Sequence, residues 1–466
     1  MLLEDDLKAE PVPMTIQRGD TPQPAEQRGD GPEQRGPAPP QQSSAGAHHK
    51  SGGDRHHESA PKSSHRGSQG GEAMTGLVLS GGGVRGAYEV GIIAGMLEAL
   101  GGSHAPNPFQ IAAGASVGAI NATFVAANAH APGLNLDSLI SSWTGMDFAR
   151  IFSPQLLSFF RQLFRGTALP GKDEQQLGTS LLNPAPLEAL VQETIDFERL
   201  HENVHGGVLK GLFIAALQVA TGKTTIFSEL APGMIYRHSK DPRRAAALEL
   251  VTLDHVLAST AIPLLFPARR VGSEFYCDGG LRLNTPIAPV IRAGAERLVI
   301  VSTTYVDRQS LPPSPETLAT YPSLAFLTGK VLNALLVDPL AYDLQILARI
   351  NDLVDIHQRG LQPQIGRDLQ QRMIRRRGAS YRHIETLVFV PSQDIARLAA
   401  QYLKDNLRRF DIGLVARRLL RSAAEEGNAD WATYLLFDGG FAQQVIELGR
   451  RDALRRRDEI RAFCHA

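Results

Sequence analysis

The hydrophobic pattern repeats one unit twice near the start of the folded region. A short apolar run at residues 75–80 leads through a glycine-rich turn into residues 87–100, whose apolar side chains fall on one face of a helix. A second apolar run starts at Ile111 and leads through a turn of small residues into a helix that extends to Asn128. The pattern therefore predicts two strand–turn–helix units, each with a turn of small residues.

The same criteria predict the remaining elements. Apolar runs of strand length lie at residues 212–218, 224–227, 298–302 and 386–390, and a further strand ends at Cys277. A glycine turn at residues 221–222 joins the first two of these runs into a hairpin. Helical periodicity covers residues 253–259, 323–351 with a break near Pro339, 396–410 and 441–463.

The start of the chain has a different composition. Residues 1–73 contain no Phe, Tyr or Trp and are rich in proline, glycine, glutamine, serine and histidine. Such a segment buries too little apolar surface to offset its ordering entropy, so we predict that it is disordered. Its histidines could hold a metal weakly, but a solvated tail is the favoured interpretation. We predict no metal site.

Composition and charge exclude several other classes. The 466 residues carry 48 basic and 48 acidic side chains, so no global field recruits nucleic acid and no nucleic-acid partner is expected. The chain contains two cysteines, which argues against a disulfide framework. No apolar run of about 18 residues occurs, so a membrane-spanning helix is not expected. The acidic first residues differ from a signal peptide. The expected compartment is the cytoplasm, with secretion by a route without a cleaved signal left open.

Ser116 is the first candidate for chemistry. It lies in Gly114-Ala115-Ser116-Val117-Gly118, a match to the G-x-S-x-G pattern of a nucleophile elbow. A serine at a sharp strand-to-helix turn has a strained backbone, and Gly114 and Gly118 would leave room for it. The positive end of the following helix would face a developing oxyanion. In a chain with 44 glycines the match is weak alone, and an ordinary strand-to-helix turn explains it equally well.

The glycine-rich turn at residues 81–86 permits two interpretations. Gly81, Gly83 and Gly86 match the dinucleotide-binding pattern G-x-G-x-x-G, which also needs an acidic residue about 20 positions later. Residues 101–108, which occupy that place, contain no carboxylate. A nest of backbone amides at a helix N-terminus, directed at a negative oxygen, is the more economical interpretation because the serine motif follows.

A carboxylate follows the predicted strand that ends at Cys277. Asp278-Gly279-Gly280 places it at a strand end, and the two glycines allow close approach to another loop. A simple Asp-Gly turn is the alternative interpretation. Asp438-Gly439-Gly440 repeats the string, but a helix follows it, so Asp438 is predicted to cap that helix.

Taken in order, these three blocks resemble the patatin-like phospholipase family. Residues 258–267, before the aspartate, and Asn284-Thr285-Pro286, after it, also resemble that family's flanking segments. The resemblance implies a three-layer α/β/α fold with a mostly parallel central sheet. The implied organisation is a disordered tail at residues 1–73, a catalytic domain at 74–310, and a mainly helical C-terminal extension at 311–466 packed on it.

The resemblance also implies roles for individual residues. Ser116 corresponds to the nucleophile and Asp278 to the base of a Ser–Asp dyad that hydrolyses acyl esters of lipids without metal or cofactor. The oxyanion-hole positions of the family correspond to Gly81, Gly82, Gly83 and Arg85. The other motif glycines, which support these positions, correspond to Gly86, Gly114, Gly118, Gly279 and Gly280. The implied partners are a phospholipid or other acyl lipid and the surface of a membrane.

The dyad is chemically reasonable, and two alternatives stay open. A serine hydroxyl needs a base, and a carboxylate can serve if burial in an apolar pocket raises its basicity. A Ser–Asp–His triad using His255, His357 or His383 is the alternative chemistry. A catalytically idle lipid-binding or scaffold protein on the same fold is the alternative from another class.

Overall fold

The computed structural model describes residues 73–147, 182–305, 340–360, 381–410 and 431–465, with short pieces at 176–177, 371–372, 374–375, 417 and 421. The described elements fall within the compact unit Gly70–Ala466. The tail predicted to be disordered lies outside the described residues, except for residue 73. The first part of the helix predicted from residue 323 also lies outside them.

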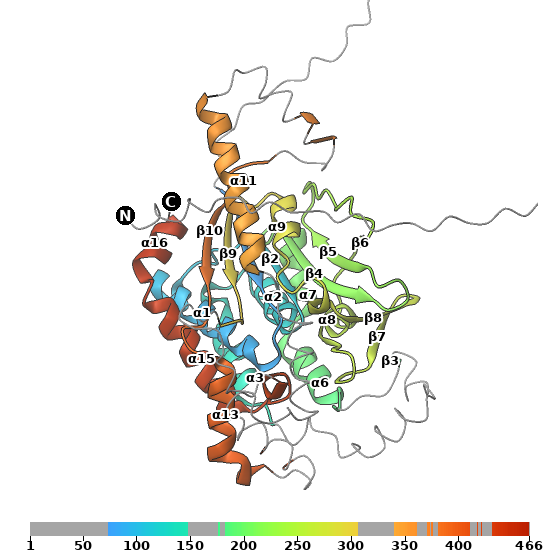
Figure 1. Cartoon of the computed structure of the whole chain (residues 1–466), viewed down its shortest axis with the longest axis vertical. Helices are drawn as coiled ribbons and strands as arrows, with labels where there is room; N and C mark the ends of the chain where they lie inside the picture. Colours follow the sequence, from blue (N-terminus) through green and yellow to red (C-terminus); the bar gives the residue numbers. More distant parts are fainter. Residues whose placement is uncertain are drawn as a thin grey trace, which may run out of the picture. The chain divides into compact units, whose positions relative to one another are not determined.

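A ten-stranded sheet runs through the described residues (Figure 1). Its strands are β1 (Thr75–Leu79), β2 (Ile111–Ala115), β3 (Gln176–Leu177), β4 (Gly211–Gln218), β5 (Thr224–Leu230), β6 (Arg244–Leu248), β7 (Ala268–Val271), β8 (Glu274–Asp278), β9 (Arg297–Val301) and β10 (Glu385–Phe389). The order is β10-β9-β1-β2-β4-β8-β7-β3, and β5 pairs with β4 and β6.

The strands β10, β9, β1, β2 and β4 are parallel to one another, whereas β8 and β5 run antiparallel to β4. The predicted hairpin of β4 and β5 and the predicted parallel strands β9 and β10 are confirmed. Because β10 joins the same sheet as β1, residues late in the chain complete the core around the first strand.

Helices flank the sheet. The described ones are α1 (Gly86–Leu100), α2 (Val117–Ala127), α3 (Leu136–Thr144), α6 (Ala185–Thr194), α7 (Phe197–His205), α8 (Leu253–Thr260), α9 (Ile287–Ala293), α11 (Leu340–Gly360), α13 (Ile395–Asn406), α15 (Gly439–Leu454) and α16 (Arg457–His465). Short 3-10 helices include η1 (Gly83–Arg85) and η7 (Trp431–Tyr434).

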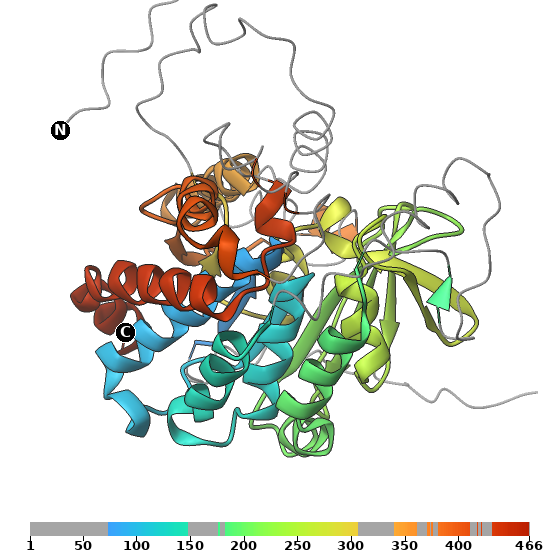
Figure 2. The same cartoon turned by 90° about the horizontal axis from the view of Figure 1, so that it is seen from below.

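Successive strand residues face opposite sides of the sheet, and each side has its own core. Leu77 and Leu79 of β1 belong to the core that includes α1, α2 and α15. Val78, between them, belongs to the core that includes α9 and the start of α11. Figures 1 and 2 show the sheet between these two groups of helices. The predicted three-layer α/β/α fold is confirmed.

The prediction of a single helix over residues 441–463 is wrong, because the structure has two helices there. The chain leaves the helical path at Arg455 and Arg456, between α15 and α16. The Arg456 guanidinium lies 4.7 Å from the centre of the Phe389 ring, and it also donates to the backbone oxygen of Val388. These contacts with β10 fix the bend at a place where the sequence shows only a charged cluster.

The helix α15 packs directly against α1 (Figure 2). A β-carbon at Gly91 would collide with the backbone oxygen of Ile446, and one at Gly449 would collide with that of Tyr88. The Tyr88 hydroxyl donates to Asp452 Oδ2 at 3.1 Å. The two backbones therefore touch, and α15 fixes the helix that begins at the glycine loop.

This close approach predicts the effect of enlarging Gly449. Gly449→Val should lower the free energy of unfolding by about 3 kcal/mol, because overpacking forces the helix backbones apart. The measurement is urea denaturation followed by circular dichroism. Gln444→Val, on the exposed face of the same helix, is the control and should cost less than about 1 kcal/mol. Equal losses in the two variants would contradict the close-packing account.

Candidate active site

The sheet register brings the predicted site residues to one place. Ala115, which precedes Ser116, lies beside Ala215 of β4. Ala216, the next residue of β4, lies beside Asp278 at the end of β8. Ser116 and Asp278 therefore end two strands that flank the same point of β4. The separation of 162 residues along the chain becomes a separation of one intervening strand.

Ser116 occupies the strained turn that the sequence predicted. Its backbone has φ 54° and ψ −130°, a conformation that side-chain-bearing residues rarely adopt. Its amide donates to Ser259 Oγ at 2.9 Å, and Ser259 Oγ donates to the Ala215 backbone oxygen at 2.6 Å. In the sequence analysis Ser259 is only one residue of the flanking segment 258–267. In the structure it fixes the strained turn to β4.

The two motif glycines around Ser116 are required by space. A β-carbon at Gly114 would collide with the backbone oxygen of Gly118. A β-carbon at Gly118 would lie 2.6 Å from the backbone oxygen of Leu79, at the end of β1. Their absence of side chains lets β2, α2 and β1 approach at the turn. The steric reason predicted for both glycines is confirmed.

Asp278 is completely buried beside this turn. Its Oδ1 accepts a hydrogen bond from the Gly280 amide at 2.7 Å. Within the described residues, Oδ2 has no hydrogen-bond partner of ordinary geometry. Burial raises the pKa of Asp278 to about 7, while hydrogen bonding from the Ser116 hydroxyl and the Gly280 amide acts in the opposite direction. The pKa of Asp278 therefore reflects burial, opposed in part by these two hydrogen-bonding groups.

The residue before it, Cys277, is buried as well. Burial and the neighbouring Asp278 raise the pKa of the Cys277 thiol to about 12. A thiol with this pKa is protonated at neutral pH and is a poor nucleophile. Its side chain therefore belongs to the packing around the carboxylate.

The glycine loop after β1 lies against the same centre. A β-carbon at Gly81 would lie 2.8 Å from Ser116 Cβ. The Gly81 amide donates to Asn284 Oδ1 at 2.9 Å, and the Gly81 oxygen accepts from Thr303 Oγ1 at 2.7 Å. This amide is therefore occupied in the structure. Among the described residues, the amides of Gly82 and Gly83 donate no hydrogen bond to another backbone group.

Residues near the end of the chain support this loop. The Arg85 guanidinium lies 5.4 Å from the centre of the Tyr434 ring, and Arg85 is buried. Gly83 has φ 61°, and a β-carbon there would lie 2.7 Å from the Thr433 backbone oxygen. The segment η7 is thus in direct contact with the glycine loop, a role that no motif in the sequence indicates.

A buried polar network joins the glycine-loop helix to the helix after Ser116. Asn121 Nδ2 donates to the Gly86 oxygen at 3.0 Å and to Glu89 Oε2 at 2.8 Å. Trp143 Nε1 donates to Asn121 Oδ1 at 3.1 Å. Burial raises the pKa of Glu89 well above its ordinary value. Sequence analysis missed this network, although Glu89 and Asn121 are polar residues in otherwise apolar helices.

Two of the three candidate histidines, His255 and His383, are described with their side chains, and both are engaged elsewhere. His255 Nδ1 contacts Thr252 at the start of α8, and its Nε2 lies 3.4 Å from Glu249. His383 Nδ1 pairs with Asp355 at 2.9 Å. The side chain of His357 lies outside what the structure describes. Among the described side chains, neither His255 nor His383 contacts Ser116 or Asp278, so the structure offers no support for a triad through them.

The second Asp-Gly-Gly string has the predicted structural role. Asp438 is the N-cap of α15 and accepts a hydrogen bond from the Phe441 amide at 3.1 Å. Its Oδ1 also accepts a hydrogen bond from the Tyr402 hydroxyl. The prediction that Asp438 caps a helix is confirmed.

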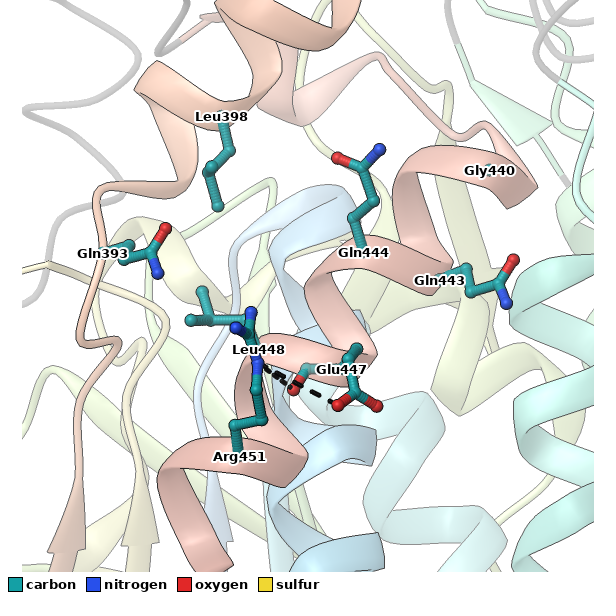
Figure 3. A pocket seen from close by; sticks show the side chains of 8 residues that line it. All are labelled: Gln393, Leu398, Gly440, Gln443, Gln444, Glu447, Leu448 and Arg451. Carbon is teal, nitrogen blue, oxygen red and sulfur yellow. Dashed lines mark hydrogen bonds and ion pairs between the residues drawn. The ribbon is translucent and has the colours of Figure 1, made fainter. Parts of the chain in front are cut away.

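A groove of about 600 Å³ lies away from Ser116, between α13 and α15 (Figure 3). Figure 3 shows Gln393 and Leu398 facing α15, where Glu447 contacts Arg451. None of its lining residues belongs to the three motif blocks. Within the described part of the chain, no cluster of His, Cys, Asp and Glu is arranged to hold a metal, and no helix has the length and apolar character to cross a bilayer.

The fold and the site define an α/β protein with a serine at a strained strand-to-helix turn and a buried aspartate beside it. Residues 77–291 match the family model described as patatin-like phospholipase. These residues therefore form a patatin-like phospholipase domain, and the match supports a lipid acyl hydrolase in general. No curated protein matches the chain.

Among solved structures, the crystal structure of VipD from Legionella pneumophila matches with 13% sequence identity and a TM-score of 0.29. The match covers 81% of this chain and 67% of that chain.

The raised pKa of Asp278 predicts a pH-dependent gain in stability for Asp278→Asn. The aspartate binds its proton more tightly in the folded state than the ordinary value of 3.8 implies, so wild-type stability falls as pH rises from about 4 to about 7. Asparagine does not ionise, and the stability advantage of the variant should grow by about 2 kcal/mol between pH 5 and pH 8. Urea denaturation at both pH values measures it. A constant difference would contradict a buried carboxylate with a raised pKa.

Proposed function

We propose that the protein is a serine lipid acyl hydrolase of phospholipase A or lysophospholipase type, with Ser116 as the nucleophile and Asp278 as its base. The observation that carries the proposal is the junction at β4, where a strained serine meets a wholly buried carboxylate with a pKa of about 7. A carboxyl group with that pKa is partly ionised at neutral pH and is basic enough to accept a proton.

In the proposed reaction, Ser116 Oγ attacks the ester carbonyl while Asp278 takes the hydroxyl proton. Breakdown of the tetrahedral intermediate returns this proton to the leaving alcohol and leaves an acyl-serine. Water then attacks the acyl-serine, again with Asp278 as base, and the fatty acid leaves. The strained turn and the buried network keep both groups in place, which limits reorganisation during the reaction.

We assign the oxyanion hole to the amides of Gly82 and Gly83, with the start of α2 nearby. Gly81 has a different part in this proposal, because its amide already donates to Asn284. It holds the loop in place together with Thr303. Arg85, packed on Tyr434, supports the same loop from behind. Donors fixed in this way stabilise the developing negative charge without having to rotate.

The proposed substrate is a phospholipid or another acyl lipid, taken from the surface of a membrane. The carboxylate needs a dry environment to keep its raised pKa, and an acyl chain that enters the site would exclude water from it. The proposal needs no metal or cofactor, because the base and the oxyanion donors all come from the chain.

Side-chain substitutions and a covalent probe test the proposal. A fluorophosphonate should label the wild type and fail to label Ser116→Ala, and fatty-acid release from phosphatidylcholine vesicles should fall at least about a hundredfold in Ser116→Ala and Asp278→Asn. Asp438→Asn is the matched control and should keep the wild-type rate, since Asp438 caps α15.

Three results would count against the proposal. Loss of activity in Asp438→Asn alone would exchange the roles of the two aspartates. Labelling of a residue other than Ser116 would show that Ser116 is not the nucleophile. Binding of vesicles by folded wild-type protein without any release of fatty acid would favour a lipid-binding protein on the same fold.

A further inference from the structure

The turn that follows α8 has an unusual residue at its third position. Leu265 donates its amide proton to the Ile262 oxygen at 3.1 Å, which closes a four-residue turn with Pro263 second and Leu264 third. Leu264 has φ 71°. This is the pattern of a type II turn, whose third position requires positive φ and therefore favours glycine or asparagine. A leucine at this position is strained.

Packing does not offset this strain. Leu264 is 52% exposed, while Ile262 and Leu265 on either side of the turn are buried. Among the described non-glycine residues with positive φ, Leu134 is buried and Asn135 is of a type that tolerates the conformation. Leu264 thus combines a strained backbone with an apolar side chain in water, and both features are unfavourable for folding.

The turn is attached to the candidate active site at both catalytic positions. Ser259, five residues earlier, holds the Ser116 amide. The Ala261 oxygen accepts a hydrogen bond from the Asp278 amide at 2.9 Å. Strained residues that the surrounding structure holds in place are concentrated at functional sites. The exposed leucine therefore extends from the same short segment that fixes the serine and the aspartate.

We propose that Leu264 is a specificity residue that contacts the acyl chain of the substrate beside the Ser116–Asp278 pair. The inference rests on the proposed function. An acyl chain that covers Leu264 removes its apolar surface from water, which makes the exposed leucine favourable in the complex. Only a chain of sufficient length reaches it, so Leu264 favours long-chain over short-chain esters.

The experiment compares p-nitrophenyl decanoate with p-nitrophenyl butyrate as substrates of the full chain. Leu264→Asn keeps a residue that accepts positive φ but removes the apolar surface. We expect kcat/KM for the decanoate to fall about tenfold, and that for the butyrate to change less than about twofold. The melting temperature should stay the same or rise. Leu264→Met, which keeps an apolar side chain, should retain the wild-type preference.

Leu248→Asn is the matched control, because Leu248 is 70% exposed on β6, which pairs with β5 and does not carry a motif residue. In this variant, kcat/KM for the decanoate and for the butyrate should stay at the wild-type values. Leu264→Gly introduces the residue that the turn favours and should show the same loss on the decanoate as Leu264→Asn. This agreement would show that the loss does not come from the asparagine side chain itself.

An undiminished rate on the decanoate in Leu264→Asn and Leu264→Gly would overturn the inference. An equal loss on both substrates would overturn it too, since Leu264 would then act on the reacting groups or their support and not on chain length. Wild-type protein that cleaves neither ester would overturn the proposed function, and this inference with it.

Discussion

The candidate active site depends on the backbone of β4 at Ala215 and Ala216. Ala215 accepts the hydrogen bond from Ser259 that holds the Ser116 turn, and a β-carbon at Gly279 would collide with the same Ala215 oxygen. Ala216 pairs with Asp278. The serine turn and the aspartate turn therefore share one support. Small residues on β4 and glycines in both turns are the condition for their contact.

The same contact has a cost in stability. A carboxyl group that is fully buried next to a serine hydroxyl loses its hydration, and this loss raises its pKa. The fold tolerates the penalty because two cores, one on each face of the sheet, surround the site with buried apolar side chains. The strain at Ser116 is a second penalty. The burial of Asp278 that lowers stability is also what makes its carboxylate more basic.

Much of this arrangement could be predicted from the sequence. The periodicity of hydrophobic residues, together with the turn residues, located β1, α1 and β2. The small residues around Ser116 indicated a strained turn. Asp278 could be preferred over Asp438 as the candidate base from the segments on either side of the two Asp-Gly-Gly sequences alone. These signals are local, since each one depends on residues within a few positions of one another.

The contacts that the sequence did not reveal are long-range. The packing of Tyr434 on Arg85 and the hydrogen bond that the Gly81 amide donates to Asn284 join residues hundreds of positions apart. No motif indicates that the Gly81 amide already donates to Asn284. The bend between α15 and α16 depends on Arg456 contacting β10, a strand distant in the chain. Positive φ at Leu264 is likewise visible only when the turn is seen in place.

The central claim is that Ser116 is activated by a carboxylate below the glycine-loop amides. A crystal structure of the protein after reaction with a fluorophosphonate tests this most directly. The account predicts phosphorus bonded to Ser116 Oγ, a phosphonyl oxygen within hydrogen-bonding distance of the Gly82 and Gly83 amides, and the Asp278 carboxylate adjacent to Oγ with no histidine in reach. An adduct whose oxygen points away from the glycine loop, or a histidine beside Oγ, would contradict it.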